Sequence, residues 1–354
     1  MAVGFPTKVN YATGDVLTAT NMNDLSGTVN LLESAQYAAG KNEIINGDMG
    51  IWQRGTSFTV ATSGSAYAAD RMLCVNESGA NATFSQQTFT PGTAPVSGYE
   101  GQFFLRAVTT GTSGATYITQ RIEDVRAFAG QTVTVSYWAK CASGTVSSAG
   151  FYLQNFGSGG SSAVFATLST ATITTSWQRF THTIAIPSIA SKTIGTSSYL
   201  EFQILRYTAA ATVDLWGVQV EAGSTASPFQ TATGTKQGEL AACQRYYNRY
   251  TPGTSAYGML SSAGVATSTT LVRATFALPV EMRTVPSAVD YSTLRFLDSA
   301  SGTGTISAAN LLSSENSPKV AFVEFTSTGL SANRPTFIQT NNSTSGYVGF
   351  TAEL

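Results

Sequence analysis

Aromatic side chains set among amides and carboxylates are the groups in this sequence with the most definite chemistry. Six of them lie between apolar positions on three alternating segments: Trp138, Tyr152, Gln154, Tyr199, Glu201 and Gln203. The apolar face of a sugar ring stacks on an aromatic ring, while its hydroxyls need hydrogen-bond partners. If the three segments are adjacent strands, these residues form one face that binds a sugar. The alternative is that this face is solvated or packs against a neighbouring protomer.

Patterns of catalytic residues are missing from the sequence. The only histidine, His182, shares strand parity with Phe180 and Ile184, which is typical of a structural histidine at the end of a core strand. No serine or cysteine in a nucleophile-elbow pattern accompanies it. Glu123 and Asp124 are adjacent, so on a strand they point to opposite faces, whereas a glycosidase needs two facing carboxyl groups. We therefore expect no enzyme activity.

We predict no cofactor and no metal. Cys74, Cys141 and Cys243 are far apart and form no C-x-x-C pattern, so we expect free and mostly buried thiols. Asp48 and Asp214 flank the first and last expected strands of the central region. Two carboxylates without a loop motif are too weak a signal to define a calcium site.

Strands must position the candidate groups. Residues 132–140 alternate with period two: Val133 and Val135 share the apolar face, which leaves Trp138 on the other. Similar segments, separated by Gly- and Ser-rich turns, follow at 151–156, 177–186 and 199–207. This pattern predicts a β-sandwich or jelly roll.

The same alternation assigns the core. Phe151 and Leu153 are expected to point inward, so the residues between them point outward. Trp216 shares parity with Val218 and Val220 and is expected beside them in the core. The core face of the segment 199–207 consists of Leu200, Phe202 and Ile204.

Bulk composition excludes several classes of protein. Only 11% of the 354 residues are charged and the net charge is −1, so no basic field exists to attract nucleic acid or anionic lipid. No run approaches the ~18 apolar residues of a membrane span, so no membrane insertion is expected. The N-terminus lacks the apolar core of a signal peptide, which indicates synthesis in the cytosol.

A helix is expected near the N-terminus. Thr20 is a suitable N-cap for a helix that runs to about Ala38. Its apolar seam, with spacings of three, four and three, consists of Met22, Leu25, Val29 and Leu32. A helix this short is marginal alone, so the seam favours a parallel homotrimeric bundle in which identical helices share it. The alternative is a helix packed on its own domain.

Several motifs keep their order over about 200 residues. Residues 45–48 read Ile-Asn-Gly-Asp, and residues 52–55 read Trp-Gln-Arg-Gly. The later motifs fall at 69–72, 120–123, 135–140, 176–180, 217–223, 227–229 and 243–247. Together they resemble a module common in bacteriophage tail fibres, which in fold is similar to carbohydrate-binding jelly rolls. The resemblance implies a β-sandwich in a trimeric virion fibre, with an affinity for sugars.

Three regions follow from this reading. Residues 1–41 are expected to be a virion-attachment segment with a short coiled-coil helix, residues 42–230 the jelly roll, and residues 231–354 a linker helix and a distal β-sandwich tip. The fold class is thus mainly β: a short N-terminal helix in a trimeric bundle, a central β-sandwich jelly roll and a C-terminal β-sandwich.

The expected function is that of a non-enzymatic homotrimeric phage tail fibre protein, made in the host cytoplasm and working in the virion. Its N-terminus would attach to other tail or baseplate proteins, and it would bind host surface polysaccharide. Three weak sites on one trimer add up through effective concentration, so shallow sites suffice. One alternative is a structural capsid or collar appendage fibre without a receptor role, and a second is a glycan hydrolase.

Overall fold

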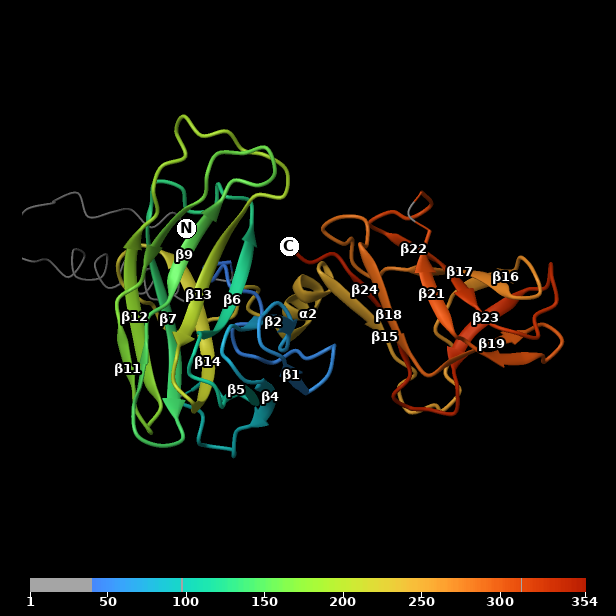
Figure 1. Ribbon diagram of the computed structural model, residues 1–354, viewed down its shortest axis with the longest axis horizontal. Helices are drawn as coiled ribbons and strands as arrows, with labels where there is room; N and C mark the ends of the chain where they lie inside the picture. The colour runs from blue at the N-terminus through green and yellow to red at the C-terminus, as the bar shows by residue number, and fades with distance from the viewer. Residues whose placement is uncertain (1–39, 97, 313) are drawn as a thin grey trace, which may run out of the picture.

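The computed structural model describes residues 40–96, 98–312 and 314–354, which form two β-rich regions around a short helix (Figure 1). The mainly β fold class is confirmed. The predicted N-terminal helix and its seam residues lie outside the described residues: Met22, Leu25, Val29 and Leu32. Within the described ranges, no helix has both the length and the apolar character needed to cross a membrane.

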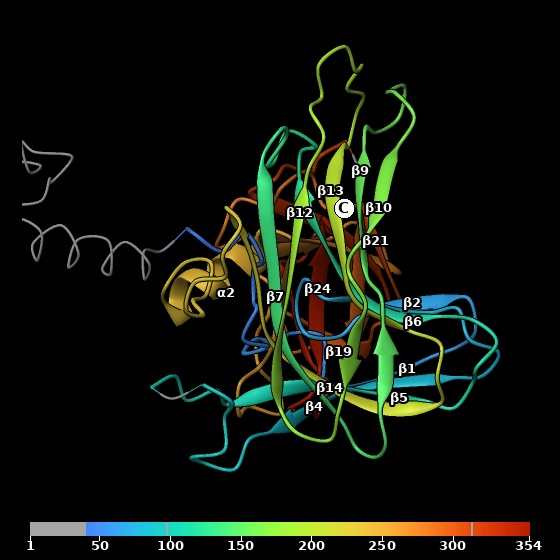
Figure 2. The same cartoon turned by 90° about the vertical axis from the view of Figure 1, so that its left-hand side faces the viewer.

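Two six-stranded antiparallel sheets form the first region (Figures 1 and 2). The first sheet has the order β1 (Ser57–Val60), β4 (Ala82–Thr88), β5 (Phe103–Thr109), β14 (Ala211–Ala222), β7 (Thr132–Cys141) and β12 (Gln178–Ala185). The second has the order β10 (Val164–Thr167), β9 (Phe151–Asn155), β13 (Tyr199–Tyr207), β6 (Thr116–Glu123), β3 (Leu73–Asn76) and β2 (Gly64–Tyr67). A small sheet pairs β11 (Ala171–Ile173) with β8 (Val146–Ser148). The predicted β-sandwich is therefore confirmed.

The core between the two large sheets follows the predicted alternation in β7 and β13. Val133 and Val135 of β7 are fully buried and pack in the same cluster as Leu200, Phe202 and Ile204 of β13. In β7 every second side chain lies in the core, as a two-layer sandwich requires, whereas a bulge in β13 places both Ile204 and Leu205 there.

The prediction for β9 is wrong. Tyr152 and Gln154 point inward, with exposed fractions of 2% and 1%, while Phe151 and Leu153 are half-buried on the opposite side. The core takes the Tyr152 ring, and the amide nitrogen of Gln154 donates to the Pro187 carbonyl at 3.1 Å. This hydrogen bond satisfies the amide nitrogen of the buried Gln154, while its amide oxygen has no partner among the described residues.

Trp216 is buried, as predicted, but on the side of its sheet away from Val218 and Val220. The pairing of β14 with β7 shifts between Trp216 and Gln219, and Gly217 within this bulge has a φ of 65°. An extra residue in a strand reverses the faces of the residues before it relative to those after it. A Cβ atom at Gly217 would lie 2.6 Å from the Trp138 ring, so glycine is required here.

Three smaller sheets form the second region, which we call the distal region (Figure 1). The first has the order β15 (Tyr247–Tyr250), β24 (Tyr347–Thr351) and β18 (Ala288–Ser292). The second has the order β16 (Ala263–Ala266), β17 (Leu271–Ala277), β22 (Val320–Thr326) and β21 (Ala308–Leu311). The third has the order β20 (Thr303–Thr305), β19 (Leu294–Asp298) and β23 (Thr336–Thr340). These sheets enclose a hydrophobic cluster separate from that of the sandwich.

The helix α2 (Lys236–Gln244) lies between the two regions (Figure 1). Thr235 is its N-cap, and the Thr235 hydroxyl accepts a hydrogen bond from the Gly238 amide at 3.0 Å. The carboxylate of Glu239 accepts hydrogen bonds from the backbone amides of Asn46 and Thr233, both at 2.7 Å. The helix is thus tied to the turn around Asn46, which precedes the first strand of the sandwich.

Two stacked arginines connect the distal region to the sandwich, and we call their contacts the joint. The carboxylate of Glu353 pairs with Arg71 and, at 3.0 Å, with Arg54. The guanidinium of Arg71 lies 3.4 Å from the ring centroid of Tyr246, and that of Arg54 lies 3.6 Å from the centroid of Tyr247. Because the arginines precede β3 and the tyrosines follow α2, these contacts hold the two regions together.

The sulfur atoms and the histidine have structural surroundings. All three cysteines are free and buried, as predicted, and burial raises the pKa of the Cys74 and Cys243 thiols. His182 is buried and lies 3.2 Å from the Tyr137 hydroxyl and 2.6 Å from that of Ser169. Burial lowers the pKa of His182, so the ring is neutral at pH 7.

Candidate functional site

The structure brings three of the six predicted sugar-binding residues together. Tyr199, Glu201 and Gln203 alternate on β13 and point away from the core of the sandwich. Tyr152 and Gln154 lie on the neighbouring strand β9, but they point into the core, as described above.

Trp138 is not part of this surface. It lies on β7 of the other sheet, where it is 8% exposed. Its ring centroid is 5.6 Å from that of Trp216 and 6.1 Å from that of Phe229, and the guanidinium of Arg179 lies 4.6 Å from it. This aromatic cluster covers the outside of the first sheet. A ring enclosed in this way stabilises the fold and offers no surface to a sugar.

The second sheet presents a continuous outer face, which we define as its side away from the core. Strand register places Glu201 opposite Arg121 of β6 on one side and opposite Leu153 of β9 on the other. The functional groups of this outer face are Tyr117, Arg121, Phe151, Phe165, Tyr199, Glu201, Gln203 and Arg206. They come from the four adjacent strands β10, β9, β13 and β6.

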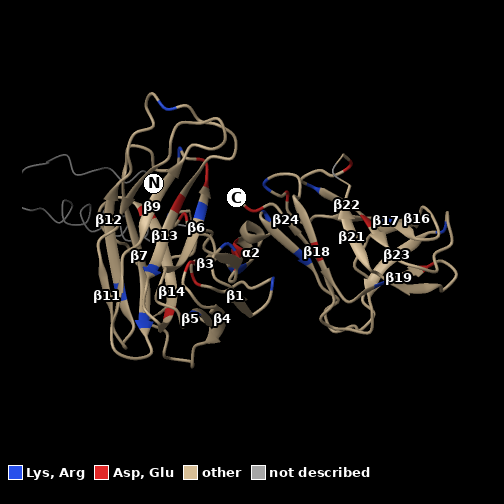
Figure 3. Ribbon diagram, in the orientation of Figure 1, with Lys and Arg blue, Asp and Glu red and all other residues tan. Residues whose placement is uncertain are grey.

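Arg121 organises one half of the outer face. Its guanidinium lies 4.6 Å from the Tyr199 ring centroid, and its Nε donates to the Glu201 carboxylate at 3.0 Å. The Tyr199 hydroxyl accepts from the Asn155 amide at 3.2 Å. Figure 3 shows the adjacent basic and acidic positions on β6 and β13. The Arg121 side chain keeps 28% of its surface exposed, whereas that of Glu201 keeps only 5%, so Arg121 is the accessible member of the pair and Glu201 orients it.

Arg206 organises the other half. Its guanidinium lies 4.8 Å from the Tyr117 ring centroid and 5.2 Å from that of Phe151. It donates to Gln203 at 3.3 Å and to Glu77 at 2.9 Å. Burial, followed by the nearby Glu77 charge, raises the pKa of Tyr117, so its hydroxyl is a neutral donor at pH 7. The row therefore offers donors and acceptors side by side.

Phe165 is the most exposed aromatic ring on the outer face. It lies on the edge strand β10 and is 70% exposed. Its ring centroid is 6.4 Å from that of Phe151, which lies on the next strand. An exposed ring beside a polar row is the combination that a sugar requires, because the ring receives the C–H face while the row receives the hydroxyls.

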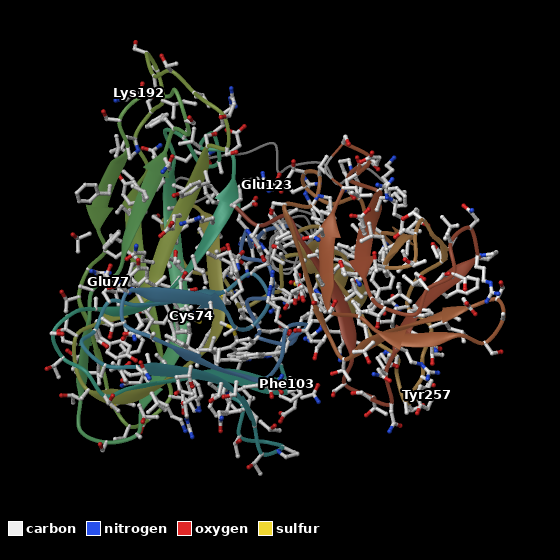
Figure 4. The ribbon with its side chains drawn as sticks, turned by 45° about the vertical axis from the view of Figure 1, so that its right-hand side comes forward. Cys74, Glu77, Phe103, Glu123, Lys192 and Tyr257 are labelled. Atoms are coloured by element: carbon white, nitrogen blue, oxygen red, sulfur yellow. The ribbon has the colours of Figure 1, made fainter. Side chains whose placement is uncertain are left out.

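Two carboxylates that the sequence analysis considered, Asp214 and Glu123, are paired with arginines. The described residues contain no group of three or more His, Cys, Asp or Glu side chains that could hold a metal ion. The Asp214 carboxylate forms an ion pair with Arg106, whose Nε donates a hydrogen bond to it at 2.7 Å. Glu123 is paired with Arg245 of α2 and lies on the side of the sandwich that faces the distal region (Figure 4).

Sequence reasoning missed five groups of the outer face, including Phe151, which was expected in the core: Tyr117, Arg121, Phe151, Phe165 and Arg206. A signal for two of them was present, since Tyr117 and Arg121 share parity in one alternating segment. Phe165 lies in a four-residue strand that follows a Gly- and Ser-rich stretch, and so short a segment carries little periodicity.

Comparisons with known proteins give only distant likenesses. No family model matches this sequence, and no curated protein matches it. A xylan-binding domain of carbohydrate-binding module family 22 from Paenibacillus barcinonensis is 12% identical with a TM-score of 0.30, over 48% of this chain and 95% of that one. Another xylan-binding domain of family 22 is 14% identical with a TM-score of 0.32, over 49% of this chain and 98% of that one.

A phage protein is among the similar structures. The enzymatically active domain of bacteriophage CBA120 tailspike protein 4 is 11% identical with a TM-score of 0.30. The match covers 52% of this chain and 22% of that one. Such low scores carry no argument about what this protein binds.

Proposed function

We propose that the outer face of the second sheet binds a polysaccharide. The observation that carries the proposal is the exposed ring of Phe165 beside the half-buried Phe151, next to a row of paired polar groups in which Arg121 and Arg206 stay partly exposed. At about 4.8 Å between strands, the four strands from β10 to β6 span roughly 14 Å. That distance suits a few sugar units of a chain lying across the strands.

Each group has a defined part in this proposal. One sugar ring stacks on Phe165, and the next units lie over β13. Their oxygens accept from the partly exposed Arg121 and Arg206, and the nearly buried Glu201 and Gln203 hold those two guanidinium groups in place. Because these polar groups are already paired with one another, the sheet holds them in place before the ligand arrives, which reduces the ordering cost of binding.

We propose further that the chain is a non-enzymatic, homotrimeric phage tail fibre protein that binds host surface polysaccharide. The ordered tail-fibre motifs over about 200 residues and the seam expected at 22–32 support this. Three outer faces on one trimer turn millimolar contacts into stable attachment through effective concentration.

The test is Phe165→Ala in the full-length chain, assayed for binding to a panel of immobilised bacterial polysaccharides. Since the ring is 70% exposed, its removal leaves the fold intact, and we expect binding to at least one polysaccharide to fall about tenfold. Tyr257→Ala is the matched control, because Tyr257 is 46% exposed on the distal region (Figure 4). Loss of binding in the control variant alone would assign the receptor site to the distal region.

Sedimentation of both variants separates binding from assembly. A wild-type trimer that becomes monomeric in Phe165→Ala would make the outer face a protomer interface, as expected for a structural capsid or collar fibre. Release of reducing ends from a bound polysaccharide would favour a glycan hydrolase. Trp138→Ala is unsuitable as a test, since Trp138 is buried.

A further inference from the structure

A cavity of about 380 Å³ lies away from the outer face, where three segments of the chain meet. One segment follows the Ile-Asn-Gly-Asp motif, the second is the loop before β5, and the third leads into α2. Its polar walls are formed by Asp48, Tyr99, Gln102, Gln230 and Lys236. The volume is at the lower end of the range of small-ligand sites, so it suits one compact ligand.

The aromatic wall is rigid. The Tyr99 ring packs against Phe229 at 5.1 Å and against Trp216 at 5.7 Å between centroids. Its hydroxyl donates to Asp48 Oδ2 at 3.1 Å. The tyrosine therefore fixes the carboxylate of Asp48 at the cavity.

Asp48 keeps unused acceptor capacity. Its Oδ1 accepts from the Gly50 amide at 3.2 Å, and its Oδ2 accepts from Tyr99. An ionised carboxylate accepts about four hydrogen bonds, so sites on both oxygens remain open. A carboxylate with two open oxygens can receive two adjacent hydroxyl groups.

Hydrogen-bond donors from the second and third segments also line the cavity. Lys236 is exposed and, among the residues that the structure describes, forms no ion pair. The side-chain amides of Gln102 and Gln230 likewise have no hydrogen-bond partner within the described ranges. Glu239, by contrast, is buried and already accepts three hydrogen bonds from Asn46 and Thr233, so we assign it to the wall of the cavity.

We propose that this cavity is a second carbohydrate site, which takes a single neutral sugar residue through vicinal hydroxyls donated to Asp48. Lys236 and the two amides hydrogen-bond the remaining oxygens. The outer face, in contrast, is suited to an extended chain, so the two sites differ in the size of ligand that they accept.

The experiment uses the full-length chain and free monosaccharides (glucose, galactose, mannose and N-acetylglucosamine). Tryptophan fluorescence is the readout, because Trp216 contacts Tyr99 at the cavity wall. We expect at least one sugar to give a saturable change with millimolar affinity, and Asp48→Asn to weaken it about tenfold or more. Asparagine can still accept from Tyr99, so the wall is retained. If Asp48→Asn does not fold, Lys236→Met replaces an exposed side chain and is expected to weaken the same sugar.

Two controls make the outcome decisive. Glu281→Gln removes a carboxylate that is 58% exposed in the distal region and should leave sugar binding unchanged. Phe165→Ala should also leave it unchanged, since the outer face is separate. The inference is overturned if no monosaccharide gives a saturable change, if both cavity variants bind as the wild type does, or if calcium alone produces the change. Loss of monosaccharide binding in Phe165→Ala would overturn it too, while leaving the proposed function intact.

Discussion

The joint and the outer face use the same pair of residue types in opposite ways. In both, a guanidinium lies over a tyrosine ring and pairs with a carboxylate: Arg71 with Tyr246 and Glu353 in the joint, and Arg121 with Tyr199 and Glu201 on the outer face. The arginine side chain is 1% exposed in the joint and 28% exposed on the outer face.

This difference in burial decides what each pair does. A buried charge cannot exchange its partner for water, so losing that partner leaves the full cost of desolvation. When a charge keeps a quarter of its surface in solvent, replacing its partner changes the free energy of unfolding little, because water and salt screen the charge. The buried arginine of the joint therefore stabilises the fold, and the partly exposed arginine of the outer face is available to a ligand.

The largest effect is expected from Arg71→Met. The substitution leaves Glu353 half-paired in a buried site, and we expect the free energy of unfolding to fall by about 3–5 kcal/mol. Denaturant titration followed by circular dichroism measures it. If Arg71→Met lowers the free energy of unfolding no more than Arg206→Met does, burial does not distinguish the joint from the outer face.

A second expected effect is on pH dependence at the joint. Burial raises the pKa of Asp70 to about 6 from its ordinary value of 3.8. The folded chain then holds this proton more tightly than the unfolded chain does. The stabilisation is complete below about pH 4 and is lost as the pH rises through 6, with a total of the order of 3 kcal/mol at about 1.4 kcal/mol per pKa unit.

Asp70→Asn removes that titration. Between pH 4 and pH 7 the free energy of unfolding of the wild type should decrease relative to that of the variant, as followed by denaturant titration at several pH values. Parallel curves for the two proteins would show that Asp70 titrates alike in the folded and unfolded chains.

Tyr199→Ala tests the exposed pair. We expect polysaccharide affinity to fall by about threefold to tenfold, corresponding to roughly 0.5–1.5 kcal/mol for one aromatic contact. Isothermal titration with the polysaccharide identified by the panel measures this, and the loss of stability should be smaller than for Arg71→Met. A variant that binds normally would remove Tyr199 from the site.

The smallest effect is expected from Arg206→Gln. Its ion pair with Glu77 joins side chains that are 25% and 45% exposed, so the free energy of unfolding should change by less than about 1 kcal/mol. Thermal denaturation at low and high salt checks this. A larger loss that persists at high salt would mean that burial is not what separates the two regions.

Local alternation predicted much of the sandwich, because it reports directly which side of a strand is apolar. It placed Val133, Val135 and Leu200 in the core correctly. It failed for Tyr152, because the pattern favours the more apolar Phe151 for the core. A tyrosine ring can nevertheless be buried where there is space for its hydroxyl group. It also failed for Trp216, because a single inserted residue at Gly217 reverses the side of the strand.

The candidate site was harder to predict than the core. Assembling it requires knowing which strands are neighbours, and periodicity within a strand carries no such information. Trp138 and Tyr199 have similar local patterns, yet one lies on each sheet. The cavity beside Asp48 is formed by three segments that are far apart in the sequence, so it follows only from the folded chain.

The three buried thiols have a practical consequence. No cystine cross-links this chain, and each sulfur is shielded from solvent oxidants. Its stability should thus be the same with or without dithiothreitol, so preparations can be stored aerobically without scrambling. We therefore expect this protein to be equally stable in a reducing compartment and in air.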